Sequence, residues 1–190
     1  MTEDFVKDEH VLQPIIKAMF KALNKPKAKV IVCKDPRFHG TSQALKWEWI
    51  KQALDRHRGM IDIFLLCVDR DGEQHRQSVL TGLENQAAVE IGRNRAFFAE
   101  NAWQEVEVWL LAGHDLPSEW DWKTIRSHRD PKEHYYVPFA EQRGVSNLPA
   151  EGRGKLAHEA AANYDRIRQK CEEDLQRLHS RIESWIGLPR

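Results

Sequence analysis

The sequence predicts a single α/β domain with a central, mainly parallel sheet and helices on both faces. Residues 28–33 (AKVIVC) are apolar and β-branched, and residues 61–68 (IDIFLLCV) are almost continuously apolar. Such runs are typical of strands that are buried on both faces. Between them, residues 42–58 place apolar side chains at helical spacing. This succession of strand, helix and strand predicts a parallel crossover unit.

Helical spacing predicts further elements on either side of this unit. Upstream, we expect a helix that begins near Val11 or Leu12 and ends at Leu23, with Pro14 in its first turn. Downstream, we expect a helix, a short strand and another helix, over residues 74–88, 95–99 and 102–112.

The last two fifths of the chain predict an irregular excursion and then helices, within one domain that spans residues 1–190. Residues 115–154 are rich in Trp, His, Pro and charge. We expect four aromatic side chains to pack this excursion onto the body: Trp120, Trp122, Tyr135 and Tyr136. Residues 155–187 carry an apolar helical stripe, including Leu175, Leu178 and Ile182. We expect the stripe to pack on the core, although it could also serve a homo-oligomer.

Composition limits the classes of partner and compartment. The 29 basic and 29 acidic side chains cancel, so a nucleic acid would have to be held by a local basic patch or through a metal. Cys33, Cys67 and Cys171 lack the paired spacing of a zinc site and indicate a reducing compartment. Neither a basic, apolar leader nor an apolar run near the roughly 20 residues of a membrane span is present. We therefore expect a cytoplasmic protein.

The acidic motif Asp69-Arg70-Asp71-Gly72 follows directly on the second predicted strand. Residues i and i+2 of a strand point to the same side, so the two carboxylates could converge on one divalent cation. The carboxyl end of a parallel strand is also where α/β sheets bind their ligands. An Asp-Gly pair is equally common in surface turns, so the motif alone leaves a solvated turn open.

A strand that ends in DxDG is typical of three kinds of enzyme. In haloacid-dehalogenase-like phosphatases the motif lies near the start of the chain and continues with Thr, whereas here Glu73 follows. Glycosyltransferases use DxD to bind the metal of a nucleotide sugar, but this chain is small for their fold. The Toprim fold is a small parallel sheet in which an N-terminal Glu and a later DxD share metal. It matches best.

Five motifs carry a closer resemblance over nearly the whole chain. They are TEDFVKDEHVLQPIIKAMF, VDRDGEQHR, EVEVWLLAGH, PKEHYYVPF and, at the end, GRGKLAHEAAANYDRIRQKCEEDLQRLHSRI. Their order resembles that of the DUF4276 family of small Toprim-related proteins. The resemblance implies kinship with the nuclease domain of overcoming-lysogeny-defect nucleases. It also implies a place in bacterial anti-phage defence and an ATPase partner.

The resemblance assigns roles to individual acidic residues. Glu3 would be the catalytic Glu, as a metal ligand or general base, and Asp69 and Asp71 would bind Mg²⁺ or Mn²⁺. Glu107 would complete or support the site. Only two residues precede Glu3, fewer than the first strand of this fold usually has, so Asp8 is an alternative acidic group.

Physical chemistry agrees with these roles. Phosphodiester cleavage needs an in-line water and stabilisation of developing negative charge, which carboxylate-bound Mg²⁺ supplies. Arg70 and Arg76 lie close enough in sequence to the motif to contact phosphate. Glu105 and Glu107 lie two residues apart and cannot share one helix face, so we expect only one of them, Glu107, at the site.

We therefore expect a metal-dependent endonuclease that acts on nucleic acid, DNA in preference to RNA. A non-catalytic module of the same fold that binds a partner ATPase is the main alternative, and a DxDG phosphatase is another. Zero net charge and a short first strand favour the interaction module.

Overall fold

The computed structural model describes residues 7–188. Within that range, two parallel strands form the sheet: β1 (Ile63–Asp69) and β2 (Ala96–Ala102). Their register runs from Ile63 opposite Ala96 to Asp69 opposite Ala102. The helix α4 (Arg76–Ile91) connects the two strands, so the parallel crossover is β1–α4–β2 and not the unit expected from residues 28–33, 42–58 and 61–68.

Helices make up most of the remaining described chain. Those before β1 are α1 (Asp8–Ala22), α2 (Thr41–Ala44) and α3 (Trp47–His57). Those that follow β2 are α5 (Glu107–Ala112), α6 (Trp122–Ser127), the π-helical turn η1 (Lys132–Tyr136), α7 (Val137–Gln142) and the 3-10 turn η2 (Pro149–Gly152). The last are α8 (Arg153–Ala162), α9 (Tyr164–Lys170), the π-helical turn η3 (Glu172–Gln176) and α10 (Arg177–Ile186).

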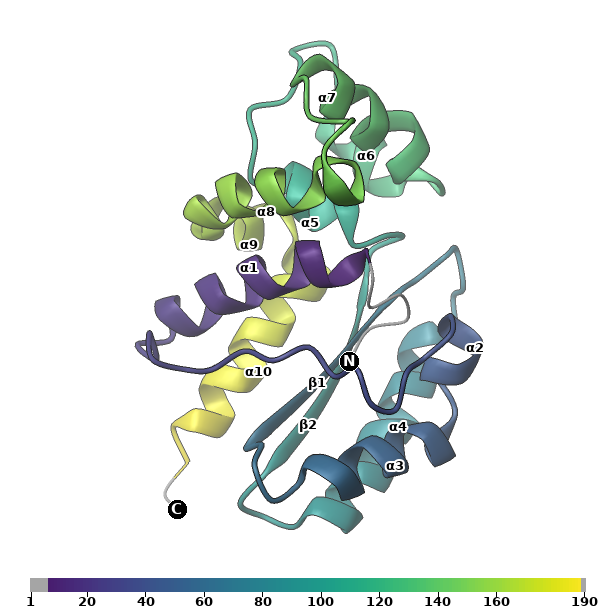
Figure 1. Cartoon of the computed structure of the whole chain (residues 1–190), viewed down its shortest axis with the longest axis vertical. Coiled ribbons are helices and arrows are strands. Elements are labelled where there is room, and N and C mark those ends of the chain that lie inside the picture. Colours follow the sequence, from purple (N-terminus) through teal and green to yellow (C-terminus); the bar gives the residue numbers. More distant parts are fainter. Residues whose placement is uncertain (1–6, 189–190) are drawn as a thin grey trace.

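Helices cover both faces of the strand pair (Figure 1). Phe64, Leu66 and Phe97 are buried on one face with residues of α3 and α4. Cys67 and Phe98 are buried on the other face with residues of α1 and α10. Full burial of one large apolar side chain contributes roughly 1.5–3 kcal/mol, so the alternation along each strand fixes which helices lie on which side. None of the helices within residues 7–188 combines the length and apolar content needed to cross a membrane.

The predicted strand at residues 28–33 is wrong. This segment has no regular secondary structure, and Ile31 within it is 56% exposed. The side chain of Gln13 donates a hydrogen bond to the carbonyl oxygen of Val30 at 3.3 Å. A hollow of about 540 Å³, lined largely by apolar side chains, lies between this segment, α1 and β1. The predicted pairing of residues 28–33 with residues 61–68 is therefore wrong too, because the parallel partner of β1 is β2.

Other predictions are confirmed with shifted boundaries. The apolar run at 61–68 forms β1, the predicted helix at 74–88 is α4, and the short strand at 95–99 is β2. The helix expected at 102–112 begins only at Glu107, because β2 continues through Ala102. The helix expected at 42–58 is divided into α2 and α3, since Lys46 has an extended backbone.

The N-terminal helix begins earlier than expected, and the C-terminal segment is more divided. α1 starts at Asp8, so Pro14 lies inside the helix rather than in its first turn and removes one internal hydrogen bond. Residues 155–187 are helical but consist of several short elements. The three apolar residues expected in its core are fully buried: Leu175, Leu178 and Ile182.

The excursion contains more helix than expected but packs as predicted. It includes α6, η1, α7 and η2 rather than an irregular chain. Tyr136 is fully buried in the core, and Trp120, Trp122 and Tyr135 are partly buried against it.

Candidate functional site

The acidic motif lies at the carboxyl end of β1, as predicted. Asp69 is the last residue of the strand, and its Oδ1 accepts a hydrogen bond from the backbone N–H of Val106 at 2.8 Å. The backbone N–H groups of Arg70 and Asp71 both donate to the carbonyl oxygen of Gln104, at 2.7 Å and 3.2 Å. The loop after β2 therefore holds the loop after β1 in place.

Two residues in these loops have a left-handed backbone that is uncommon outside glycine. Asp71 has φ 53° and Gln104 has φ 76°, and Gly72 follows Asp71 with φ 75°. The N–H of Gly72 donates to Oε1 of Gln104 at 2.9 Å, which stabilises the turn. Because Asp71 lies beyond the end of β1, strand alternation does not place its carboxylate beside that of Asp69, contrary to the argument made from the sequence.

Arg76 lies beside the exposed carboxylate of Asp71. Its Nη2 is 3.7 Å from Oδ2 of Asp71 and also donates to the carbonyl oxygen of Arg70 at 3.5 Å. The Arg76 side chain is only 12% exposed, and within residues 7–188 its buried Nε has no hydrogen-bond partner. Partial burial raises the pKa of Asp71, although Arg76 and Arg129 act to lower it. A guanidinium in this state retains the capacity to bind an anion.

Arg70, the second predicted phosphate contact, stacks on Trp103. The guanidinium carbon is 4.0 Å from the centre of the ring. Trp103 is itself fixed by Asp174, whose Oδ2 accepts from the backbone N–H of Trp103 at 2.8 Å and from the indole N–H of Trp109 at 2.8 Å. Arg126 binds the two carboxylate oxygens of Asp174 at 2.8 Å and 3.0 Å. The Trp103 ring that contacts Arg70 is therefore held in place by a buried carboxylate, and both oxygens of that carboxylate accept hydrogen bonds.

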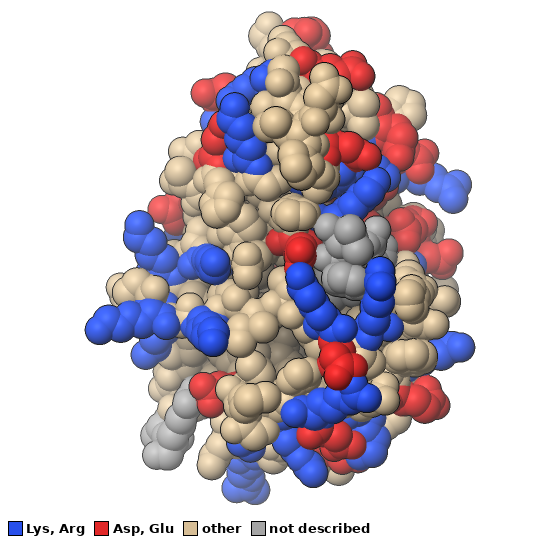
Figure 2. All heavy atoms as spheres, viewed as in Figure 1, with Lys and Arg blue, Asp and Glu red and all other residues tan. Residues whose placement is uncertain are grey.

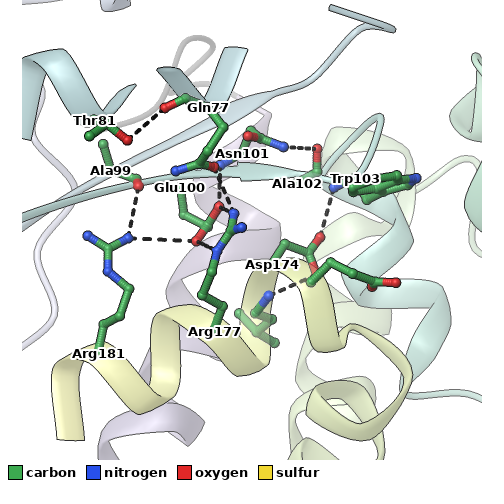
Figure 3. Close-up of polar contacts among 12 residues, drawn as sticks. Gln77, Thr81, Ala99, Glu100, Asn101, Ala102, Trp103, Asp174, Arg177 and Arg181 are labelled. Carbon is green, nitrogen blue, oxygen red and sulfur yellow. Dashed lines mark hydrogen bonds and ion pairs between the residues drawn. The ribbon is translucent and has the colours of Figure 1, made fainter. Parts of the chain in front are cut away.

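A second buried carboxylate ties the C-terminal helices to the strands (Figure 3). Glu100, in the middle of β2, is fully buried and accepts hydrogen bonds from Nε (3.0 Å) and Nη2 of Arg177. Nη2 of Arg177 also donates to Gln77 of α4 at 2.7 Å, and Arg181 lies 3.8 Å from Glu100. Burial raises the pKa of Glu100 even though Arg177 acts to lower it. These interactions link β2 to α10 and to α4.

Glu107 lies in a buried ion pair rather than at an open site. The residue is 4% exposed, and Nε and Nη2 of Arg153 lie 2.9 Å and 2.7 Å from its Oε1. Arg153 is itself 1% exposed. A metal ion at Glu107 would have to compete with this guanidinium for the carboxylate.

Glu105, which the sequence argument set aside, is a partly accessible carboxylate in the loop that holds the acidic motif. Its Oε2 accepts from the backbone N–H of Lys132 at 2.8 Å. Burial, together with the charges of Glu107 and Glu133, raises the pKa of Glu105 to about 7, although the hydrogen bond from Lys132 acts to lower it. Glu105 precedes α5, so the argument from helix faces that favoured Glu107 did not apply to it. Its neighbour Val106 donates the hydrogen bond to Asp69.

The remaining predicted metal ligands are Glu3 and its alternative, Asp8. Glu3 lies outside the described residues. Asp8, the alternative, begins α1 and is 8% exposed. Burial, together with the charges of Glu100 and Asp8, raises the pKa of the Cys67 thiol to about 12, which indicates that Asp8 lies near β1.

The residues around the acidic loop match a Mg²⁺ or Mn²⁺ site only in part. Carboxylate oxygens suit these ions, which keep several waters. Yet residues 7–188 contain no group of three or more His, Cys, Asp or Glu side chains that could hold a metal. Asp69 and Asp71 would therefore need another acidic group.

Basic and acidic side chains are interspersed over most of the face drawn in Figure 2, although basic side chains predominate along its left margin. This agrees with the zero formal net charge. Comparisons with protein-family models, with curated proteins and with solved structures found no match. Fold and site thus define an α/β protein with an acidic loop and nearby arginines at the carboxyl edge of a parallel strand pair.

Proposed function

We propose that this chain is a Toprim-type, divalent-metal-dependent endonuclease that serves in bacterial anti-phage defence. The observation that carries the proposal is the Asp69-to-Gly72 loop. It follows a buried parallel strand, is held on Gln104 by three hydrogen bonds, and has Arg76 beside it. Loops at this end of a parallel sheet are where α/β proteins bind ligands.

The acidic residues would share the metal. Asp69 and Asp71 would hold Mg²⁺ or Mn²⁺ together with an N-terminal acidic group, Glu3 or Asp8. When bound, the ion would supply charge stabilisation and a more acidic water. We assign Glu107 a supporting role, because Arg153 already neutralises it.

Two other side chains would act on the substrate directly. The Nη2 of Arg76 lies 3.7 Å from the exposed carboxylate of Asp71 at this loop, which supports its binding a phosphate oxygen there. Glu105 has its pKa raised to about 7, in the range in which a carboxyl group exchanges protons efficiently at neutral pH. We therefore assign Glu105 to proton transfer at the attacking water or the leaving oxygen.

The test combines Mn²⁺ titration, melting temperature and nuclease assays. Asn can still accept the Val106 N–H through its amide oxygen, so Asp69→Asn should leave the metal-free melting temperature unchanged. It should abolish both the rise in melting temperature with Mn²⁺ and any Mn²⁺-dependent cleavage. Asp62→Asn is the matched control, because Asp62 is exposed just before the opposite end of β1. It should behave as wild type.

A second candidate function is a non-catalytic module that binds a partner ATPase. The lack of a three-ligand group within residues 7–188 favours it. Calorimetric titration that shows no Mn²⁺ binding, with and without oligonucleotide, would select this function over the nuclease.

A further inference from the structure

Four aromatic and imidazole rings gather in the excursion, next to the acidic loop. Trp120 and Tyr135 meet edge to face with their centroids 5.2 Å apart. His128 lies 5.6 Å from Tyr135 and 4.1 Å from His134. Trp120, His128 and Tyr135 are partly buried and His134 is exposed, so the cluster is anchored on the core and remains accessible from solvent. We call these four residues the ring cluster.

The chain between these rings borders the candidate site. Arg129 and Asp130 follow His128 and are close enough for their charges to shift the pKa of Asp71 in opposite directions. Lys132, two residues before His134, donates its backbone N–H to Glu105. A ligand bound at the acidic loop would therefore meet the ring cluster along residues 128–135.

The local charge does not by itself explain how a polyanion would bind here. Arg129 and Lys132 are accompanied by Asp130 and Glu133, and the whole chain has no net charge. Phosphate attraction alone would be weak on such a surface. Stacking of bases on aromatic rings needs no net charge and tolerates any sequence.

We propose that the ring cluster is a stacking surface for the bases of a single-stranded nucleic acid whose backbone passes Arg129 and Arg76. The bases of a duplex are stacked on one another and do not reach such rings. The inference deepens the proposed function and rests on it for the choice of ligand. It adds that the substrate is single-stranded at the site.

Fluorescence anisotropy in EDTA tests this inference without any metal. The probes are a labelled 20-nucleotide single-stranded DNA of mixed sequence, the same sequence as a duplex, and the matching single-stranded RNA. Wild type should bind both single strands more tightly than the duplex. His134→Ala and Tyr135→Ala should each weaken single-strand binding by about five-fold or more, whereas Tyr135→Phe, which keeps the ring, should not.

Matched controls separate stacking from general effects. His158→Ala removes an exposed imidazole from α8 and should bind as wild type. Arg129→Ala should lower the slope of log K against log salt by about 0.7, the value for one phosphate contact on a single strand. Arg93→Ala removes an exposed arginine after α4 and should leave that slope unchanged.

Three outcomes would overturn the inference. The first is equal affinity for duplex and single strand. The others are unchanged single-strand binding by a folded His134→Ala variant and no detectable binding by the wild type. His134 is exposed, so this variant decides the matter if Tyr135→Ala does not fold. Ring-dependent binding without Mn²⁺-dependent cleavage would support this inference and contradict the nuclease. Cleavage that is unaffected by loss of the rings would contradict this inference alone.

Discussion

Arg153 directs two guanidinium nitrogens, Nε at 2.9 Å and Nη2 at 2.7 Å, onto the same oxygen of Glu107, and both side chains are almost completely buried. Burial alone would lower the pKa of Arg153, but the charges of Glu107 and Glu151 outweigh it and raise the pKa above its usual value. Removal of Glu107 would leave the buried charge of Arg153 balanced only by the partly exposed Glu151.

Glu107→Gln should therefore destabilise the fold by about 3–5 kcal/mol, measured by urea unfolding. The control is Asp115→Asn, since Asp115 pairs with Arg166 at 2.6 Å but its side chain is 97% exposed. A change below about 1 kcal/mol is expected there. Equal effects of the two substitutions would contradict a structural role for Glu107.

Glu105 should make stability depend on pH in the metal-free protein. Its folded pKa of about 7 lies above the ordinary value of 4.5, so the stability that it contributes is present below pH 4.5 and is lost as pH rises through 7. Glu105→Gln should match wild type at pH 4 and be more stable by about 1 kcal/mol at pH 8, after allowance for partial solvent exposure. Urea unfolding at both pH values in EDTA measures this. A difference that does not change with pH would count against the raised pKa.

Two Gly→Ala substitutions should have opposite effects. A Cβ at Gly113 would lie 2.6 Å from Cα and Cβ of Ala160, where α5 and α8 make contact, so Gly113→Ala should cost about 1–3 kcal/mol. A Cβ at Gly82, within α4, meets nothing within 4 Å, so Gly82→Ala should stabilise by about 0.5–1 kcal/mol. Urea unfolding should give these signs. Destabilisation by both would show that α4 is packed more tightly than described.

Leu178→Glu should unfold the chain rather than change its oligomeric state. Leu178 is fully buried in α10, and a charge there costs several kcal/mol. Val89→Glu, at a position that is 85% exposed, should change stability by no more than about 0.5 kcal/mol. Circular dichroism with light scattering measures both. A folded Leu178→Glu monomer that replaces a wild-type oligomer would instead make the stripe an interface.

Elements with a strong local pattern could be predicted from the sequence. β1 and β2 are short apolar runs, and α4 lies between them at a length typical of a crossover, so local periodicity and order were sufficient. Residues 28–33 have the same local pattern as β1, but pairing depends on which segment lies alongside in space. No local signal carries that information.

In the candidate site, too, some features could be predicted from the sequence and others could not. The position of Asp69 at the end of a buried strand follows from the sequence, because strand and motif are adjacent. The partners that decide the state of the other carboxylates are distant: Arg153 lies 46 residues after Glu107, and Lys132 lies 27 residues after Glu105. The left-handed turn at Gln104 has no glycine to reveal it.

The packing of α1 against α8 has a consequence for biosynthesis. The apolar face of α1, which includes Val11, Ile15 and Met19, is made first, and the helix that covers it ends only at Ala162. At the usual pace of translation the ribosome needs on the order of ten seconds to make the intervening chain. Throughout that interval the apolar face of α1 has no α8 to pack against, so native burial of this face has to wait until α8 has been made.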